Sequence, residues 1–321
     1  DRGHVVTFDR NGRLVYYFRR GETFKRGLGS DVHLRFRQDD RKRRRLTDPE
    51  ALRIFSETLE LAQRHGQSTN GEAKRRLEEE ILIWSPEQLL GERERFESTY
   101  RPISILPPDK YRAIVVQVTE GCSWNRCTFC NFYMNRPFRL RSVAEFENHT
   151  KAVRCLLGEG IRLREGIFLA DGNALAMSNR RLDPLLDRVA EVFPGHDLFG
   201  FVDLYSGERR RRAEWKHLYD RGLRRVYIGM ETGLDELLAL VNKPGSAGEL
   251  EGFVEVLKAA GLEISLIVMM GLGGIEFRDR HRKATRDLLL RLGLERRDLI
   301  YLSPFVEHLD SEYGRRRKEA G

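Results

Sequence analysis

Apolar and polar positions alternate in the first part of the chain, between residues 4 and 37, around clear turn residues. Two such runs, residues 5–8 and 14–18, flank the turn Asp9-Arg10-Asn11-Gly12. A period of two is typical of strands that bury one face, and a short glycine-containing turn between two such strands is typical of a hairpin. The sequence therefore begins with a predicted β-hairpin.

Helical patterns follow this hairpin. Asp48-Pro49-Glu50 predicts a helix start, with aspartate at the N-cap and proline at the first helical position. The predicted helix carries an apolar stripe, at Leu52, Phe55 and Leu59. A second helix is predicted around residues 72–83. The stretch from Ser85 to Lys110 contains four prolines and is interpreted as a linker.

From residue 112 onward, strand-like and helical patterns alternate. Short apolar runs predict six strands, at residues 113–118, 166–170, 198–204, 225–229, 263–270 and 299–303. Residues 142–145 and 246–249 are Ser-x-x-Glu capping boxes at helix starts. Six β/α units in succession predict a parallel sheet, closed or partly closed like a barrel. In such a fold the chemistry lies at the carboxyl ends of the strands.

The predicted organisation has three parts: an N-terminal extension (residues 1–111), the β/α region (112–310) and a C-terminal tail (311–321). The net charge of +8 lies wholly near the start, because residues 1–45 hold 14 Lys/Arg and 6 Asp/Glu. Five consecutive basic residues at 41–45 could contact nucleic acid or an acidic partner. Such a run is more often a solvated, mobile stretch, and that interpretation is favoured.

The composition argues against a membrane or secreted protein. The longest apolar stretch, residues 264–275, is interrupted by Ser265 and three glycines and is too short to cross a bilayer. The beginning of the sequence shows no apolar signal segment. Four cysteines, three of them within nine residues, do not resemble a disulfide framework. We therefore expect a cytoplasmic protein that binds a metal.

The three clustered cysteines, Cys122, Cys127 and Cys130, follow the first predicted strand of the β/α region. Thiolates at this spacing suit an iron–sulfur cluster or zinc. A structural zinc site needs four ligands. The remaining cysteine, Cys155, lies in an apolar helical stretch and is predicted to be a buried core thiol. Three thiolates leave one iron of a four-iron cluster open to another ligand, and this site is favoured over zinc.

At these cysteines the chain resembles the radical S-adenosylmethionine (SAM) superfamily, in the branch that includes anaerobic coproporphyrinogen oxidases, heme chaperones and tRNA-modifying members. The family motif is C-x3-C-x2-C with an aromatic residue before the last cysteine. This chain has C-x4-C-x2-C, with Phe129 as the aromatic residue, which the resemblance also implies as a cofactor contact. The resemblance covers roughly residues 112–305. It implies an α/β fold, a partial (β/α)6 barrel of the partial TIM-barrel kind with a small N-terminal α+β extension.

The resemblance also implies where SAM binds, because residues at successive strand ends match the family's SAM contacts in order. These residues are Asp171, Gly172 and Asn173 after the second strand, Asp203 and Ser206 at the third, Glu231 and Lys243 at and beyond the fourth, and Gly271 after the fifth. Glu231 is expected to accept hydrogen bonds from the ribose hydroxyls and Lys243 to pair with the SAM carboxylate. The turn of residues 271–274 gives room for adenine.

Other roles stay open for several of these residues. Asp171 and Glu231 could be carboxylates that cap loops, and Lys243 could be an ordinary surface lysine. Residues 271–274 could be only a tight turn. His281, in the helix after the fifth strand, is more simply a solvated or core histidine than a catalytic one.

The family likeness implies an enzyme with a 4Fe–4S cluster and SAM as cofactors. One-electron reduction would cleave SAM to methionine and a 5′-deoxyadenosyl radical, which would abstract hydrogen from an unidentified substrate. An electron donor such as flavodoxin or ferredoxin is the implied partner. A small-molecule substrate is favoured. A nucleic-acid-modifying enzyme and a non-enzymatic heme- or cofactor-binding relative are the alternatives.

Overall fold

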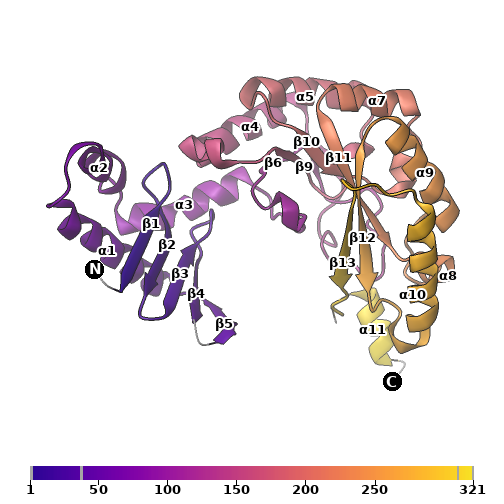
Figure 1. Ribbon diagram of the computed structural model, residues 1–321, viewed down its shortest axis with the longest axis horizontal. Coiled ribbons are helices and arrows are strands. Elements are labelled where there is room, and N and C mark those ends of the chain that lie inside the picture. Colours follow the sequence, from indigo (N-terminus) through magenta and orange to yellow (C-terminus); the bar gives the residue numbers. More distant parts are fainter. Residues whose placement is uncertain (1–2, 37–38, 309–310, 320–321) are drawn as a thin grey trace. The chain divides into compact units, whose positions relative to one another are not determined.

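The computed structural model describes residues 3–36, 39–308 and 311–319. Contacts within the chain divide it into two compact units, whose elements are labelled in Figure 1. The first unit contains Asp1–Pro102 and Ala152–Arg164, and the second contains Ile103–Lys151 and Glu165–Gly321. None of the described helices combines the length and apolar character that are needed to cross a bilayer.

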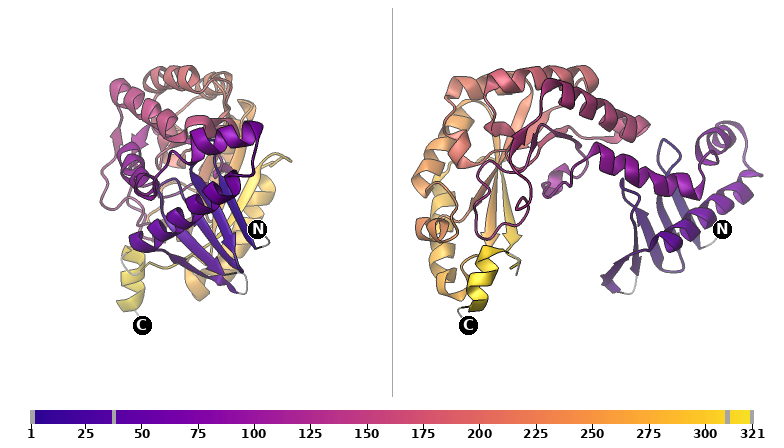
Figure 2. Two further views of the ribbon diagram at one scale, coloured as in Figure 1. Left: turned by 90° about the vertical axis from the view of Figure 1, so that its left-hand side faces the viewer. Right: turned by 180° about the vertical axis from the view of Figure 1, so that it is seen from behind.

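The first unit contains an antiparallel sheet whose strands follow one another in sequence order: β1 (His4–Phe8), β2 (Leu14–Arg19), β3 (Glu22–Arg26), β4 (Val32–Phe36) and β5 (Asp39–Arg45). Strands β1 and β2 pair as the predicted hairpin. Helix α1 (Asp48–Gly66) covers one face of the sheet (Figure 2), where Tyr17 and Phe24 share a buried core with Phe55 of the helix. Burial of one sheet face against a helix explains the alternating pattern of the strands.

The predicted linker from Ser85 to Lys110 is wrong over most of its length, because helix α3 occupies Pro86–Thr99. The Ser85 hydroxyl accepts the Gln88 N–H at 3.1 Å, and the Gln88 side chain accepts the Ser85 N–H at 2.8 Å. This is a reciprocal capping box, and Pro86 stands in the first turn, where its missing N–H costs nothing. Pro86 therefore begins a helix instead of marking a linker.

Two further helix predictions need adjustment. The N-cap of α1 is Thr47 and not Asp48, and the Thr47 N–H donates to Glu50 Oε2 at 2.8 Å. The helix expected around residues 72–83 is instead helix α2 (Gly71–Arg76), which continues as a π-helical turn, Leu77–Ile81.

The basic run at 41–45 lies in strand β5, which pairs with β4 and forms an edge of the sheet. Arg43, Arg44 and Arg45 are exposed. Arg44 pairs with Glu50 at 2.8 Å. Charged side chains are common on edge strands, where they discourage pairing with other chains.

Cys155 is exposed, so the prediction of a core thiol is wrong. Helix α4 (Val143–Leu157) buries the residues on either side of it, Val153 and Leu156. Residues three apart share a helix face, and position 155 falls outside that face. The Cys155 thiol instead lies 2.7 Å from the Arg95 guanidinium.

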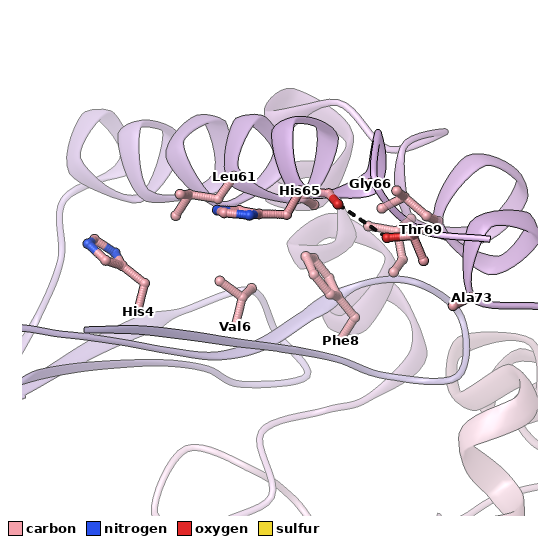
Figure 3. A pocket seen from close by; sticks show the side chains of 11 residues that line it. His4, Val6, Phe8, Leu61, His65, Gly66, Thr69 and Ala73 are labelled. Carbon is pink, nitrogen blue, oxygen red and sulfur yellow. Dashed lines mark hydrogen bonds between the residues drawn. The ribbon is translucent and has the colours of Figure 1, made fainter. Parts of the chain in front are cut away.

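An apolar pocket of about 300 Å³ lies in the first unit, between strand β1 and the end of α1. Figure 3 shows His4, Val6 and Phe8 of the strand facing Leu61 and His65 of the helix. None of the predicted site residues lines this pocket.

The second unit is built on six parallel strands: β6 (Ile114–Gln117), β9 (Ile167–Ala170), β10 (Leu198–Phe201), β11 (Leu223–Glu231), β12 (Glu263–Met270) and β13 (Leu299–Pro304). They correspond one to one to the predicted strands. Their order in the sheet is their order in the sequence, and β6 and β13 form its two edges. The predicted partial barrel is therefore confirmed.

Helices connect successive strands and lie along the outside of the curved sheet (Figures 1 and 2): α4, α5 (Asn179–Val192), α7 (Arg212–Asp220), α9 (Ala247–Ala259) and α10 (Gly274–Arg291). Every residue of β6, β9 and β10 is buried, as expected for parallel strands covered on both faces. Near the amino ends of the strands, Asp109 accepts hydrogen bonds from Arg225 in β11 at 3.2 Å and Tyr301 in β13 at 2.5 Å. The candidate site lies at the other end of the sheet, at the carboxyl ends of the strands.

Candidate functional site

The three clustered cysteines lie in the loop after β6, at the carboxyl end of that strand. The short strands β7 (Thr119–Glu120) and β8 (Arg139–Leu140) pair with each other and close the base of this loop. Gly121 begins the loop with a φ of 75°, and a Cβ atom there would lie 2.7 Å from the Arg136 carbonyl oxygen. Glycine is therefore required where the two arms of the loop meet.

The extra residue between the first two cysteines is accommodated by a left-handed backbone at Asn125, whose φ is 47°. Asparagine tolerates this conformation better than most residues. Its Nδ2 donates to the Tyr133 carbonyl oxygen at 2.9 Å. The Trp124 indole donates to the Asn242 carbonyl oxygen, beyond β11, at 2.8 Å. Two side chains of the loop therefore fix the longer C-x4-C spacing, one through a carbonyl within the loop and one through a carbonyl in the segment that follows β11.

All three cysteines line one cavity of about 200 Å³. Five of the predicted SAM contacts line the same cavity: Phe129, Gly172, Asp203, Glu231 and Lys243. The other four are not among its lining residues: Asp171, Asn173, Ser206 and Gly271. The structure thus brings the cysteines together with about half of the predicted contacts, from four different strand ends.

The three thiols are free and line the same cavity. Burial, supported by the neighbouring cysteines and opposed by the charge of Lys243, raises the pKa of Cys127 to about 12. Burial is also the main cause of a raised pKa at Cys130. Within the described ranges, no three Cys, His, Asp or Glu side chains converge as they would around a single metal ion. In a four-iron cluster, however, each thiolate binds a different iron. Three cysteines distributed around one cavity fit that arrangement better than a zinc site.

Glu231 ends strand β11 in an irregular backbone. The pairing with β12 shifts between Gly229 and Glu231, and Glu231 has a φ of 58°. Its Oε1 lies 3.1 Å from Lys243 Nζ, and the two side chains are 8% and 13% exposed. A Cβ atom on Gly229 would lie 2.4 Å from Glu231 Oε1. The bulge and the glycine therefore permit a buried ion pair in the cavity wall.

This ion pair retains an unused acceptor. Glu231 Oε2 is buried and has no hydrogen-bond partner. Burial alone would lower the pKa of Lys243, but the Glu231 carboxylate raises it above its ordinary value, so the ammonium group stays charged. Buried polar atoms are normally paired, and an unpaired carboxylate oxygen in a cavity wall is ready to accept a donor from a ligand.

Asp203 follows β10 and caps helix α6 (Leu204–Gly207), where it accepts the Ser206 N–H at 2.6 Å. The buried Asn173 donates from Nδ2 to the Asp203 carboxylate and to Ser206 Oγ, and its Oδ1 accepts the Asp203 N–H at 3.1 Å. Ser123 of the cysteine loop lies 3.2 Å from the same carboxylate. Asn173 and Ser206 therefore hold Asp203 in position from behind the cavity wall.

Asp171 directly follows β9 and is buried. Tyr133 donates to its Oδ1 at 3.0 Å, and Arg136 donates to its Oδ2 at 3.1 Å. Burial raises the pKa of Asp171, although these two partners oppose the shift. Both carboxylate oxygens are engaged by the cysteine loop, and the neighbouring Gly172 lines the cavity instead. Asp171 thus positions the loop.

Phe129, before the last cysteine, lines the cavity and packs in a core with Leu272 and with Tyr313 of helix α11 (Glu312–Glu319). Gly271 lies in the turn between β12 and α10 with a φ of 90°. In the same turn, the Gly273 N–H donates to the Tyr313 hydroxyl at 3.2 Å. The glycine turn is therefore packed against α11 and is not among the cavity residues.

The sequence did not reveal the apolar wall of the cavity. Ile267 and Met269 of β12 line it, together with Phe201 and Val202 at the end of β10. The alternation of residues 267 and 269 was a usable signal, since alternate strand residues face the same side. Tyr133 of the cysteine loop also lines the cavity, but no sequence pattern predicted its place there.

His281 in α10 lies away from this cavity. It is 5% exposed, and its Nδ1 is 2.6 Å from Thr232 Oγ1. Burial lowers its pKa, which favours the neutral ring. It is a core histidine, as the sequence favoured.

Comparison with solved structures returns several radical SAM enzymes. The methyltransferase TsrM from Kitasatospora setae, with cobalamin and a [4Fe–4S] cluster bound, is 15% identical over 69% of this chain and 44% of its own, with a TM-score of 0.48. The coproporphyrinogen III oxidase HemN from Escherichia coli is 14% identical over 65% of this chain and 48% of its own, with the same TM-score. The cobalamin-dependent enzyme OxsB is 16% identical over 75% of this chain and 38% of its own, with a TM-score of 0.48.

This chain therefore spans less than half of the length of each of these enzymes. No curated protein sequence matches it. The sequence profile of the Radical SAM superfamily matches residues 116–284, more than half of the chain. That region runs from strand β6 through the three cysteines to helix α10. The protein belongs to the radical SAM superfamily.

Proposed function

We propose that this protein cleaves SAM reductively and uses the resulting radical to abstract hydrogen from a small-molecule substrate. Members of its family contain a 4Fe–4S cluster and SAM. One observation carries the proposal: the three thiols and a buried ion pair with an unfilled acceptor line the same cavity. When bound there, the cluster supplies one electron, which breaks a carbon–sulfur bond of SAM and gives methionine and a 5′-deoxyadenosyl radical.

The residues of this chain have the following roles in the proposal. Cys122, Cys127 and Cys130 bind three irons of the cluster and leave the fourth open for SAM. Lys243 pairs with the SAM carboxylate, and the unpartnered Glu231 Oε2 accepts a hydrogen bond from a ribose hydroxyl.

The apolar wall excludes water from the reaction. Phe129, Ile267 and Met269 line the cavity together with the charged groups. A dry cavity protects a carbon radical from side reactions and strengthens the electrostatic contacts that orient SAM. Reduced thiols and a cluster of this kind fit a cytoplasmic location, and a flavodoxin or ferredoxin is the proposed source of the electron.

Anaerobic reconstitution with iron and sulfide tests the cluster. We expect about four irons and about four sulfides per chain, and an EPR signal that changes when SAM is added. Replacing Cys122, Cys127 or Cys130 with alanine should abolish the signal. Cys155→Ala is the matched control and should leave it intact, because Cys155 is exposed and lies in the other unit.

The activity itself is tested by incubating the reconstituted protein with dithionite and SAM. Formation of 5′-deoxyadenosine would support an enzyme and would argue against a non-enzymatic heme- or cofactor-binding relative. Stoichiometric zinc without iron uptake, or an intact cluster that never cleaves SAM, would contradict the proposal. Product analysis with a small-molecule extract and, separately, with tRNA would distinguish the two classes of substrate.

A further inference from the structure

Two aromatic and two arginine side chains form a cluster beside the cysteine loop, which we call the Arg–aromatic patch: Arg126, Trp124, Tyr205 and Arg209. The Trp124 and Tyr205 ring centres lie 5.6 Å apart. The Arg126 guanidinium lies 5.5 Å from the Trp124 ring centre, and the Arg209 guanidinium lies 4.3 Å from the Tyr205 ring centre. Both distances fall in the range of cation–π contacts.

The charged ends of this patch are available to a partner. Arg126 and Arg209 are exposed, and Tyr205 is 38% exposed. In the described part of the chain neither arginine forms an ion pair, whereas the neighbouring Arg211 pairs with Glu214 at 3.5 Å. The aromatic rings hold the two guanidinium groups at the surface without neutralising their charge.

The patch adjoins the candidate cofactor cavity. Trp124 and Arg126 belong to the loop between the first two cysteines. Tyr205 lies in α6, whose N-cap, Asp203, lines the cavity. A protein bound over the patch therefore covers the outer side of the loop that carries two of the three thiols.

We propose that the Arg–aromatic patch docks an acidic surface of a protein electron donor. This inference rests on the proposed function, in which each cleavage of SAM consumes one electron. In the proposed function the electron is supplied by a reduced donor protein, such as a flavodoxin, which is oxidised by one electron for each SAM cleaved.

The composition of the patch favours this occupant. Tryptophan, tyrosine and arginine are the residues most enriched at the energetic centres of protein interfaces. Unpaired surface arginines attract carboxylates and accelerate association with an acidic partner. A single-stranded nucleic acid instead needs free aromatic faces for its bases. Each ring of the patch already has a guanidinium over it and the other ring beside it.

The double variant R126E/R209E tests the docking surface. With reduced flavodoxin as the electron source at limiting concentration, formation of 5′-deoxyadenosine should fall on the order of tenfold or more, and the KM for flavodoxin should rise. With dithionite, the rate should equal that of the wild type. The iron content should be unchanged, because neither side chain binds the cluster.

The matched control is R296E/R297E, which makes the same change of charge near the amino ends of the strands. Arg297 pairs there with Glu263, the first residue of β12, at 3.5 Å. This variant should use flavodoxin as the wild type does. An equal loss in the control, or an unchanged KM for flavodoxin in R126E/R209E, would overturn the docking proposal.

Other outcomes separate this inference from the function on which it rests. Wild-type protein that fails to cleave SAM even with dithionite would refute the proposed function itself. If R126E/R209E loses iron, the neutral variant R126Q/R209Q takes its place and should show a smaller rise of the same KM. Salt-sensitive tRNA retention that the double variant alone loses, with flavodoxin use unchanged, would reassign the patch to nucleic acid and overturn the docking of a donor.

Discussion

The backbone of β11 is irregular at Glu231, in the wall of the candidate SAM site. A side chain other than glycine rarely adopts a positive φ, and such residues concentrate at functional positions. Glu231 does so at the end of β11, one residue after a bulge and directly beside the cavity. From the sequence, Glu231 and Lys243 were predicted as two separate SAM contacts. It could not show that they contact each other, because their pairing depends on the path of the chain through α8 (Asp235–Leu240).

The buried pair allows a test at the level of single residues. Glu231→Gln or Lys243→Met should each lower the free energy of unfolding by about 3 kcal/mol, because each leaves one buried charge uncompensated. The double variant should lose less than the sum of the two. Since the pKa of Lys243 is raised in the folded state, this stabilisation should be complete at neutral pH and decline only as the pH rises past the ordinary lysine value of about 10.4. Urea unfolding across pH measures both effects.

The same variants test the proposed SAM contacts of Glu231 and Lys243. Each lost charged contact should weaken SAM binding by about 1.5–3 kcal/mol, or roughly ten- to a hundredfold, in protein that keeps its iron. Equilibrium dialysis with the reconstituted protein measures this affinity. Full-strength SAM binding by the double variant would show that the cavity recognises SAM through other residues.

At the scale of elements, the strands of the barrel were predictable because parallel strands are continuous apolar runs. For example, the strand predicted at residues 263–270 has the same first and last residues as β12. Helix α3 was not recognised, because four prolines between Ser85 and Lys110 were read as one linker. The same logic that identified Pro49 at the start of α1 applies to Pro86. The position of a proline relative to a capping residue, and not the number of prolines, distinguishes a helix start from a linker.

Strands β3 to β5 were only partly apparent in the sequence. β5 consists entirely of charged residues and has none of the apolar alternation by which strands are recognised. Its conformation comes from backbone pairing with β4, and that pairing is set by tertiary structure. No local pattern in residues 39–45 could have predicted it.

The cysteine loop supports a prediction about its extra residue. Asn125→Ala should destabilise the loop by about 1–2 kcal/mol, through the left-handed backbone and the lost bond to Tyr133. Asn125→Gly loses only the bond, because glycine adopts a positive φ freely. After reconstitution, iron retention during incubation with a chelator should therefore rank wild type, then glycine, then alanine. Glycine and alanine variants that behave alike would mean that backbone strain at this position is unimportant.

At the scale of the whole molecule, the candidate site combines segments that are far apart in the sequence. Sequence order was enough to expect this meeting, because carboxyl ends of parallel strands share one edge of the sheet. It was not enough to decide which side chains reach the cavity. Asp171 was a reasonable candidate, yet Tyr133 and Arg136 of the cysteine loop engage both of its oxygens. Hydrogen bonds of this kind depend on three-dimensional packing, and no local sequence pattern predicts them.

The integrity of the first unit depends on one buried arginine. Arg13 is 4% exposed and pairs with Glu92 at 2.7 Å, while donating to the Leu156 carbonyl oxygen at 2.8 Å. Arg13→Met should leave the Glu92 carboxylate without this partner and destabilise the unit by about 3 kcal/mol. Hydrogen exchange should show faster exchange of amides in β1–β4 and unchanged protection in β9–β12. Equal loss of protection in both sheets would show that the two units unfold together.

The first unit is made of two stretches of chain, Asp1–Pro102 and Ala152–Arg164, with the first strand of the barrel encoded between them. On the ribosome, the early part of this unit emerges before two of its hydrogen-bond acceptors are made, the carbonyl oxygens of Leu157 and Leu156, to which Asn11 and Arg13 donate. At translation speeds of about 5–20 residues per second, the intervening segment, Ile103–Lys151, takes roughly 2.5–10 s to synthesise. The first unit can therefore form these two hydrogen bonds only after the cysteines at 122–130 have been synthesised. The completion of this unit is coupled in time to the synthesis of the segment that holds the candidate metal ligands.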